Sequence, residues 1–180
     1  ADADYQTYRF ETDSVWSSEI EIRDGQVLKN LRTHSSVDRR DNLGFSTEET
    51  HRVWSGNENL ENIPLGDFPG QAYASRITRR NYRNDPEAWF LGQTKEIQVQ
   101  SCLDGQCGPW VRSSFEYDSQ TGSRTKLTKY PESALQNTRE YKFDAYGNMI
   151  QTNWTDGTQH RGSALVYDDK ENIYPVCRIN

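Results

Sequence analysis

Two cysteines separated by a turn sequence are the sharpest chemical feature of the chain. Cys102 and Cys107 flank Leu103-Asp104-Gly105-Gln106, and Asp-Gly supplies the two positive-φ residues that a two-residue hairpin turn needs. The cysteines then face each other at a non-hydrogen-bonded pair, with Cα atoms roughly 4.5 Å apart, a separation that a disulfide tolerates. We therefore predict a disulfide and an oxidising compartment, with two reduced neighbouring thiols as the alternative. Cys177 is left over, either free or with a partner in a missing part of the chain.

The other reactive side chains lack the spacing of a metal or catalytic site. His34, His51 and His160 are scattered, and zinc needs more ligands than one cysteine pair offers. The segment 34–38 holds the residue types of a catalytic triad, but nothing resembles a nucleophile elbow. We therefore predict no metal, no cofactor and no enzymatic activity.

Composition excludes two classes of function and describes the expected core. A net charge of −6 argues against general binding to nucleic acid, and no apolar run approaches the length of a membrane span. Aromatic residues make up 12% of the chain, although hydrophobic residues make up only 33%. This combination indicates a folded protein with a thin core and much polar surface. Because the chain begins Ala1-Asp2-Ala3 without Met, we expect either a removed leader or a piece of a longer protein.

Strand and turn signals dominate, so the predicted fold is all-β with little helix. Residues 5–10 alternate aromatic and polar side chains, and residues 19–30 are typical of a hairpin around Asp24-Gly25. Residues 95–101 alternate again, and residues 110–117 follow as their return strand. Residues 85–90 offer at most one capped helical turn.

A stretch rich in Gly, Asn and Pro, residues 55–70, is the best candidate for a loop or linker. It separates an N-terminal β segment, residues 1–70, from a second β segment, residues 71–180. The alternative is that both segments belong to one continuous sheet.

A repeated pattern runs through the second segment. Tyr117-Asp118, Phe143-Asp144 and Tyr167-Asp168 each pair an aromatic residue with an aspartate, at a spacing near 25 residues. Periods between about 20 and 50 residues are typical of repeated supersecondary units. The unit here is one hairpin that ends in a turn opened by aspartate, whose side chain accepts hydrogen bonds from backbone N–H groups.

These residues resemble the YD repeats of the Rhs family, whose relatives include the B and C components of bacterial Tc toxin complexes. Residues 141–150 fit the family unit well, with Phe143 in place of a tyrosine and Gly147 after the aspartate. Residues 115–127 fit with a longer turn, and Tyr167-Asp168 fits only in part because no glycine follows. Upstream, residues 81–92 are similar to the segment that precedes the family's repeats. The resemblance covers residues 72–180.

The resemblance implies antiparallel hairpin repeats in a curved open sheet, as part of a shell that encloses or presents a toxic C-terminal cargo. It implies secretion and, as partners, the remainder of a larger Rhs-type protein or other shell subunits. It implies packing and turn roles for Trp89 and Gly92, and structural roles for the repeat residues Tyr117, Asp118, Phe143, Asp144, Gly147, Tyr167 and Asp168. The chain is far shorter than a usual Rhs shell and lacks the Asp-Pro-x-Gly-Leu motif, so we expect a shell segment or a short member that must assemble.

Two other hypotheses follow from the residues. In the first, the chain is a secreted β-sheet module that binds carbohydrate or protein, and Trp54, Trp110 and Trp154 stack on sugar rings or on a partner surface. In the second, it is a small effector enzyme whose site comes from residues 1–70, with His34 or His51 near carboxylates.

Overall fold

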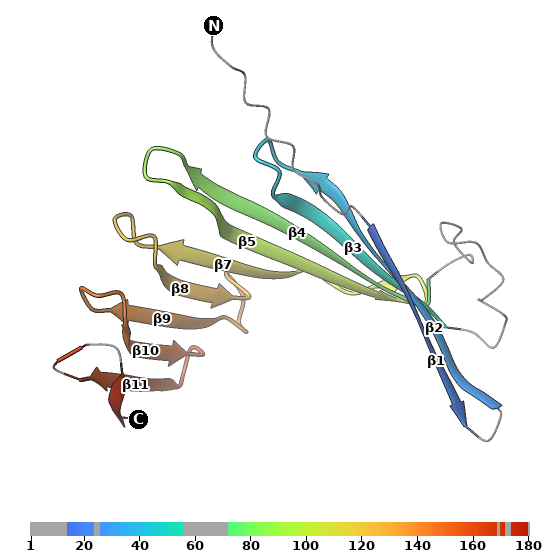
Figure 1. The fold of residues 1–180 in the computed structure, drawn as a ribbon. Coiled ribbons are helices and arrows are strands. Elements are labelled where there is room, and N and C mark those ends of the chain that lie inside the picture. Colours follow the sequence, from blue (N-terminus) through green and yellow to red (C-terminus); the bar gives the residue numbers. More distant parts are fainter. Residues whose placement is uncertain (1–13, 24–25, 56–71, 169, 172–173, 180) are drawn as a thin grey trace, which may run out of the picture. The chain divides into compact units, whose positions relative to one another are not determined.

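The computed structural model describes residues 14–23, 26–55, 72–168, 170–171 and 174–179 (Figure 1). These residues form strands and turns and contain no helix. The strands make an open antiparallel sheet in which hydrogen-bonded neighbours follow chain order, except that the short strand β6 pairs with β5 beside this path. The predicted all-β fold, built from antiparallel hairpins in an open sheet, is therefore confirmed.

The chain divides into two units, which we describe separately. The first comprises residues 1–77 and 101–107, and the second comprises residues 78–100 and 108–180. Strands of the first unit are β1 (Ser14–Arg23), β2 (Gln26–Arg40), β3 (Ser46–Ser55) and β6 (Gln106–Cys107). Two long strands, β4 (Ala74–Asp85) and β5 (Phe90–Leu103), contribute to both units. The second unit continues with β7 (Val111–Tyr117), β8 (Arg124–Lys129), β9 (Asn137–Phe143), β10 (Met149–Thr155), β11 (His160–Tyr167) and β12 (Pro175–Ile179).

Aromatic stacking across the strands holds the first unit together. Trp16 of β1 lies opposite His34 of β2, and their ring centroids are 4.3 Å apart. The Trp16 ring also stacks on Trp54 of β3 at 5.7 Å. Trp54, only 3% exposed, is the one buried apolar side chain among the described residues. The thin core that the composition predicts is therefore real in the described part of the chain.

The predicted hairpin of residues 19–30 agrees with the pairing of β1 and β2, in which Arg23 lies opposite Gln26. Its Asp24-Gly25 turn, the predicted strand at residues 5–10 and most of the loop predicted at 55–70 lie outside the described residues.

The two faces of the second unit differ in chemistry. Side chains alternate between faces along a strand, and the register places Phe115 opposite Leu127 and Trp154 opposite Arg139. We call one side the aromatic face, and it carries Phe115, Tyr117, Leu127, Tyr141, Trp154 and Leu165, all half-buried. No described apolar residue of this unit is fully buried.

Ion pairs occupy the opposite, polar face. Arg112 Nε lies 2.5 Å from Glu96 Oε2, and Lys126 Nζ lies 3.3 Å from Glu116 Oε1. Exposed pairs of this kind contribute at most about 1 kcal/mol each to the free energy of unfolding. The polar face is therefore compatible with water and adds little to stability.

The predicted disulfide is confirmed. Asp104 and Gly105 both have positive φ, at 48° and 77°, which is the combination of a type I′ turn. Cys102 lies opposite Cys107 in the ladder, and the two are bonded. Cys177 of β12 is a free, exposed cysteine.

The arrangement of cysteines predicts a simple thiol count. The chain contains 3 cysteines, of which Cys177 is free and exposed. A thiol-reactive chromophore should therefore report one thiol in the native, non-reduced protein and three after reduction in denaturant. A native count of three would contradict the disulfide, and the variant Cys177→Ser, expected to give none, is the control.

Candidate functional site

The predicted repeat turns share one pattern of hydrogen bonds. Asp144 opens the turn between β9 and β10, and its Oδ1 accepts the backbone N–H groups of Tyr146 and Asn148, both at 2.9 Å. Its own N–H donates to the Asn148 carbonyl at 3.0 Å, and the Gly147 N–H donates back to the Asp144 carbonyl at 3.2 Å. One carboxylate thus satisfies N–H groups that the ladder leaves unpaired at the end of the hairpin.

The other two repeat aspartates act in the same way. Asp118 Oδ1 accepts the N–H groups of Gln120 and Thr121 in the turn between β7 and β8. Asp168 accepts the N–H groups of Glu171 and Tyr174 after β11, through its two carboxylate oxygens. The three turns follow β7, β9 and β11, which are every second strand, so they lie at the same end of the second unit's ladder (Figure 1).

The repeat tyrosines bond to the neighbouring strand. Tyr117 OH donates to the Thr94 carbonyl of β5 at 2.9 Å, and Tyr167 OH donates to the Met149 carbonyl of β10 at 3.3 Å. The ladder register shifts at both tyrosines, and it shifts again in β10 beside Met149, which lies opposite Phe143. Such β-bulges re-aim side chains and increase local twist. Phe143 has no hydroxyl and cannot make this bond.

One turn of the same construction escaped the sequence analysis. Asp41, between β2 and β3, accepts the N–H groups of Leu43 and Phe45 through Oδ1. Its own N–H donates to the Phe45 carbonyl, and Gly44 N–H donates to the Asp41 carbonyl. The signal was present, since Asp41 and Gly44 have the same spacing as Asp144 and Gly147. It was missed because Arg40, rather than an aromatic residue, precedes the aspartate.

The upstream residues of the resemblance lie in and beside the turn between β4 and β5. Asp85 Oδ1 accepts the Ala88 N–H at 3.1 Å, so the predicted cap is present on a single turn. Trp89 has a positive φ of 58°, and its side chain is 83% exposed. Trp89 is thus a turn residue and packs against little. Gly92, also at positive φ, donates its N–H to Asn84 Oδ1 at 2.8 Å.

Arginine side chains cover the aromatic rings of the second unit. Arg124 lies 5.6 Å from the Phe115 ring centroid and 5.5 Å from that of Tyr141. The predicted binding aromatics Trp110 and Trp154 are half-buried, with Arg79 at 4.6 Å and Arg161 at 5.7 Å from their respective ring centroids. The third predicted binding aromatic, Trp54, is buried against Trp16 and does not face solvent.

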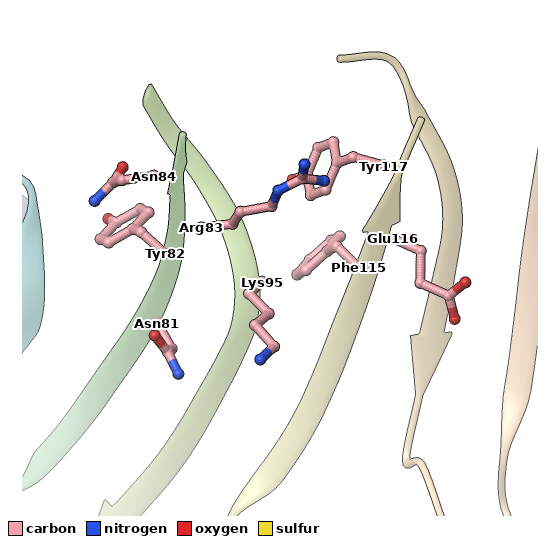
Figure 2. A pocket seen from close by; sticks show the side chains of 8 residues that line it. All are labelled: Asn81, Tyr82, Arg83, Asn84, Lys95, Phe115, Glu116 and Tyr117. Atoms are coloured by element: carbon pink, nitrogen blue, oxygen red, sulfur yellow. The ribbon is translucent and has the colours of Figure 1, made fainter. Parts of the chain in front are cut away.

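A groove of about 600 Å³ lies within the second unit (Figure 2). Its walls come from β4, β5 and β7 and consist of Asn81, Tyr82, Arg83, Asn84, Lys95, Phe115, Glu116 and Tyr117. This volume is within the range of small-molecule sites. Of these residues, the sequence analysis assigned an individual role only to Tyr117, because the groove depends on strand register rather than on a motif.

The residue types of a triad lie in the first unit without forming one. Ser35 Oγ is 2.8 Å from His51 Nδ1 across β2 and β3. Asp38 accepts hydrogen bonds from Ser36 and Thr50 instead. Burial is the main cause that lowers the pKa of His34. No three His, Cys, Asp or Glu side chains of the described residues gather as metal ligands.

Hydrogen bonds within the turns lower the pKa of two of the turn aspartates, Asp118 and Asp144. Hydrogen bonds from Thr121 and then Gln120 lower the pKa of Asp118. At Asp144 the largest single effect is desolvation, which raises the pKa, but hydrogen bonds led by those from Asn148 outweigh it and leave the pKa lowered. The ionised form therefore stabilises both turns.

Replacing Gly122 should be much more costly than replacing Gly147. Both have positive φ, at 70° and 87°, but a Cβ on Gly122 would lie 2.6 Å from Phe90 Cε1, whereas one on Gly147 meets nothing within 4 Å. We expect Gly122→Ala to lower the free energy of unfolding by about 3 kcal/mol, from backbone strain plus overpacking. Gly147→Ala, the matched control, should cost about 1 kcal/mol. Equal costs in urea unfolding would contradict the contact with Phe90.

Asp118→Asn should flatten the acid dependence of stability. Because the pKa of Asp118 is lowered in the folded state, its stabilising contribution is present above the unfolded pKa of about 3.9 and is lost as pH falls through the folded pKa. Wild type should therefore melt at a higher temperature than the variant at pH 7, and the difference should shrink toward pH 2. Glu87→Gln is the control, since Glu87 is exposed in the β4–β5 turn. A difference that persists unchanged in acid would contradict the role of ionised Asp118.

Comparison with protein-family models and with curated proteins identifies no related family or protein. Within the described residues, no helix has the length and apolar character needed to cross a membrane. The sequence matches no protein-family model and none of the curated proteins at a significant level.

Proposed function

We propose that the chain is a structural segment of a β-shell of the Rhs/YD-repeat kind, secreted and non-catalytic, which encloses or presents a toxic cargo together with other segments. The observation that carries this proposal is the recurrent aromatic–aspartate hairpin end. At Tyr117-Asp118 and Tyr167-Asp168 the hydroxyl bonds to the adjacent strand and the carboxylate holds the turn. The disulfide supports an oxidising compartment.

The free edge of the second unit supports assembly. Among the described strands, β12 pairs only with β11 and ends the strand order. All five of its residues are exposed, among them Val176 at 64% and Ile179 at 57%. An edge strand with exposed apolar side chains and unpaired backbone groups is a template for a further strand. A shell segment requires such an edge, since its sheet must continue into the next segment.

A second candidate function is a secreted binding module, and the groove between β4, β5 and β7 favours it. In that case the edge at β12 has no partner to recruit.

The two functions differ in self-association. If β12 is an assembly edge, sedimentation velocity should show oligomers at about 100 μM chain, where a micromolar Kd populates the assembly. Val176→Lys should weaken association by about tenfold or more, because a charge on an edge strand opposes pairing. Leu135→Lys is the matched control, since Leu135 is 73% exposed in a turn. A strictly monomeric wild type would contradict the assembly edge and favour the binding module.

A further inference from the structure

We infer that the groove of the second unit binds a carboxylate-bearing sugar, such as the uronate unit of an acidic glycan. This inference does not rest on the shell function, because the groove uses side chains of β4, β5 and β7 and leaves the β12 edge untouched. It also differs from the binding mode predicted from the sequence, which relied on tryptophans.

Two cations reach the groove from neighbouring strands. Arg83 of β4 and Lys95 of β5 both line it, and Figure 2 shows the Arg83 guanidinium extending toward the Tyr117 ring. Lys95 is exposed and makes no ion pair with another described residue. Arg83 has only a long contact with Asp85, 3.7 Å between Nη2 and Oδ2. Arg124 adds positive charge beside the Phe115 ring.

The one acidic side chain of the groove lining does not point into the groove. Glu116 is the only acidic residue of the lining, and its carboxylate pairs with Lys126 on the polar face. Figure 2 shows its side chain turned away from the Phe115 ring. The groove is therefore locally cationic on a chain whose net charge is −6, which selects an anionic ligand.

The remaining lining residues suit a sugar ring. Phe115, whose ring centroid also lies 5.6 Å from Arg124, and Tyr117 both line the groove, and aromatic rings of this kind can pack against the C–H face of a pyranose. Asn81 is exposed and offers an amide donor and acceptor for ring hydroxyls. The planar fork of Arg83 matches a carboxylate with two parallel hydrogen bonds.

An acidic peptide fits the same site less well. Peptides bind sheets chiefly by adding a strand to a free edge. β5 and β7 are interior strands: they pair with each other from Glu96 opposite Ser114 to Val99 opposite Val111, and each also pairs with its outer neighbour. Beside the groove, the Thr94 carbonyl of β5 accepts the Tyr117 hydroxyl. Because neither strand is a sheet edge, we expect recognition in this groove to come chiefly from side chains.

The test is calorimetric titration of the full chain with tri-galacturonate at low salt, with neutral galactotriose and hexaglutamate as comparison ligands. We expect a Kd for tri-galacturonate below about 1 mM, at least tenfold weaker binding of both comparison ligands, and weakening with added salt. Lys95→Ala should reduce affinity by about tenfold, and Phe115→Leu by about fivefold.

Lys142→Ala is the matched control for Lys95→Ala. Lys142 is an exposed lysine on β9 whose neighbour Tyr141 points to the aromatic face, so its own side chain lies on the polar face. Its variant should bind like wild type. The inference is overturned if tri-galacturonate does not bind, if galactotriose or hexaglutamate binds as tightly, or if Lys95→Ala and Lys142→Ala behave alike. Thermal melting of each variant separates lost binding from lost folding.

Discussion

The second unit is held together by its hydrogen-bonded ladder, because it has no covering layer of apolar side chains in the described residues. Among the described residues, the one buried apolar side chain is Trp54, which belongs to the first unit. Cross-strand side-chain pairs contribute roughly 0.2–1 kcal/mol each, so stability accumulates strand by strand. The arginines stacked over Phe115, Tyr141 and Trp154 add to this lateral packing without needing a second layer.

Because the second unit has no deep core, burial specifies its strand register only weakly, and hydrogen bonds of the repeat unit fix the register instead. When neither face is fully buried, a slip of one residue costs little through burial, and the register is weakly specified. The turn at Asp144 fixes the loop length by pairing its carboxylate with two N–H groups. The hydroxyl of Tyr117 fixes its strand against the preceding one through Thr94. The aromatic residue and the aspartate therefore have complementary roles: the tyrosine hydroxyl fixes its strand against one neighbour, and the aspartate fixes the turn to the next strand.

What the sequence could predict follows from how local each feature is. The disulfide between Cys102 and Cys107 depends on a two-residue turn, and the Asp144 turn depends on a glycine three residues away. Because both features are local, the sequence predicts them. The Asp41 turn obeys the same local rule and was overlooked only because the aromatic residue was treated as obligatory. The burial of Trp54 could not be predicted from the sequence, because it depends on ring stacking with the distant Trp16, whose strand and that of Trp54 both pair with β2.

The groove could not be predicted from the sequence. Arg83, Lys95 and Phe115 are separated by more than a turn in sequence, and only the alignment of three strands brings them into one wall. The two proposed roles depend on different parts of the sheet, since the proposed assembly edge is β12 and the proposed ligand groove lies on β4, β5 and β7. If both proposals hold, one sheet serves as a scaffold at its edge and as a receptor on one face.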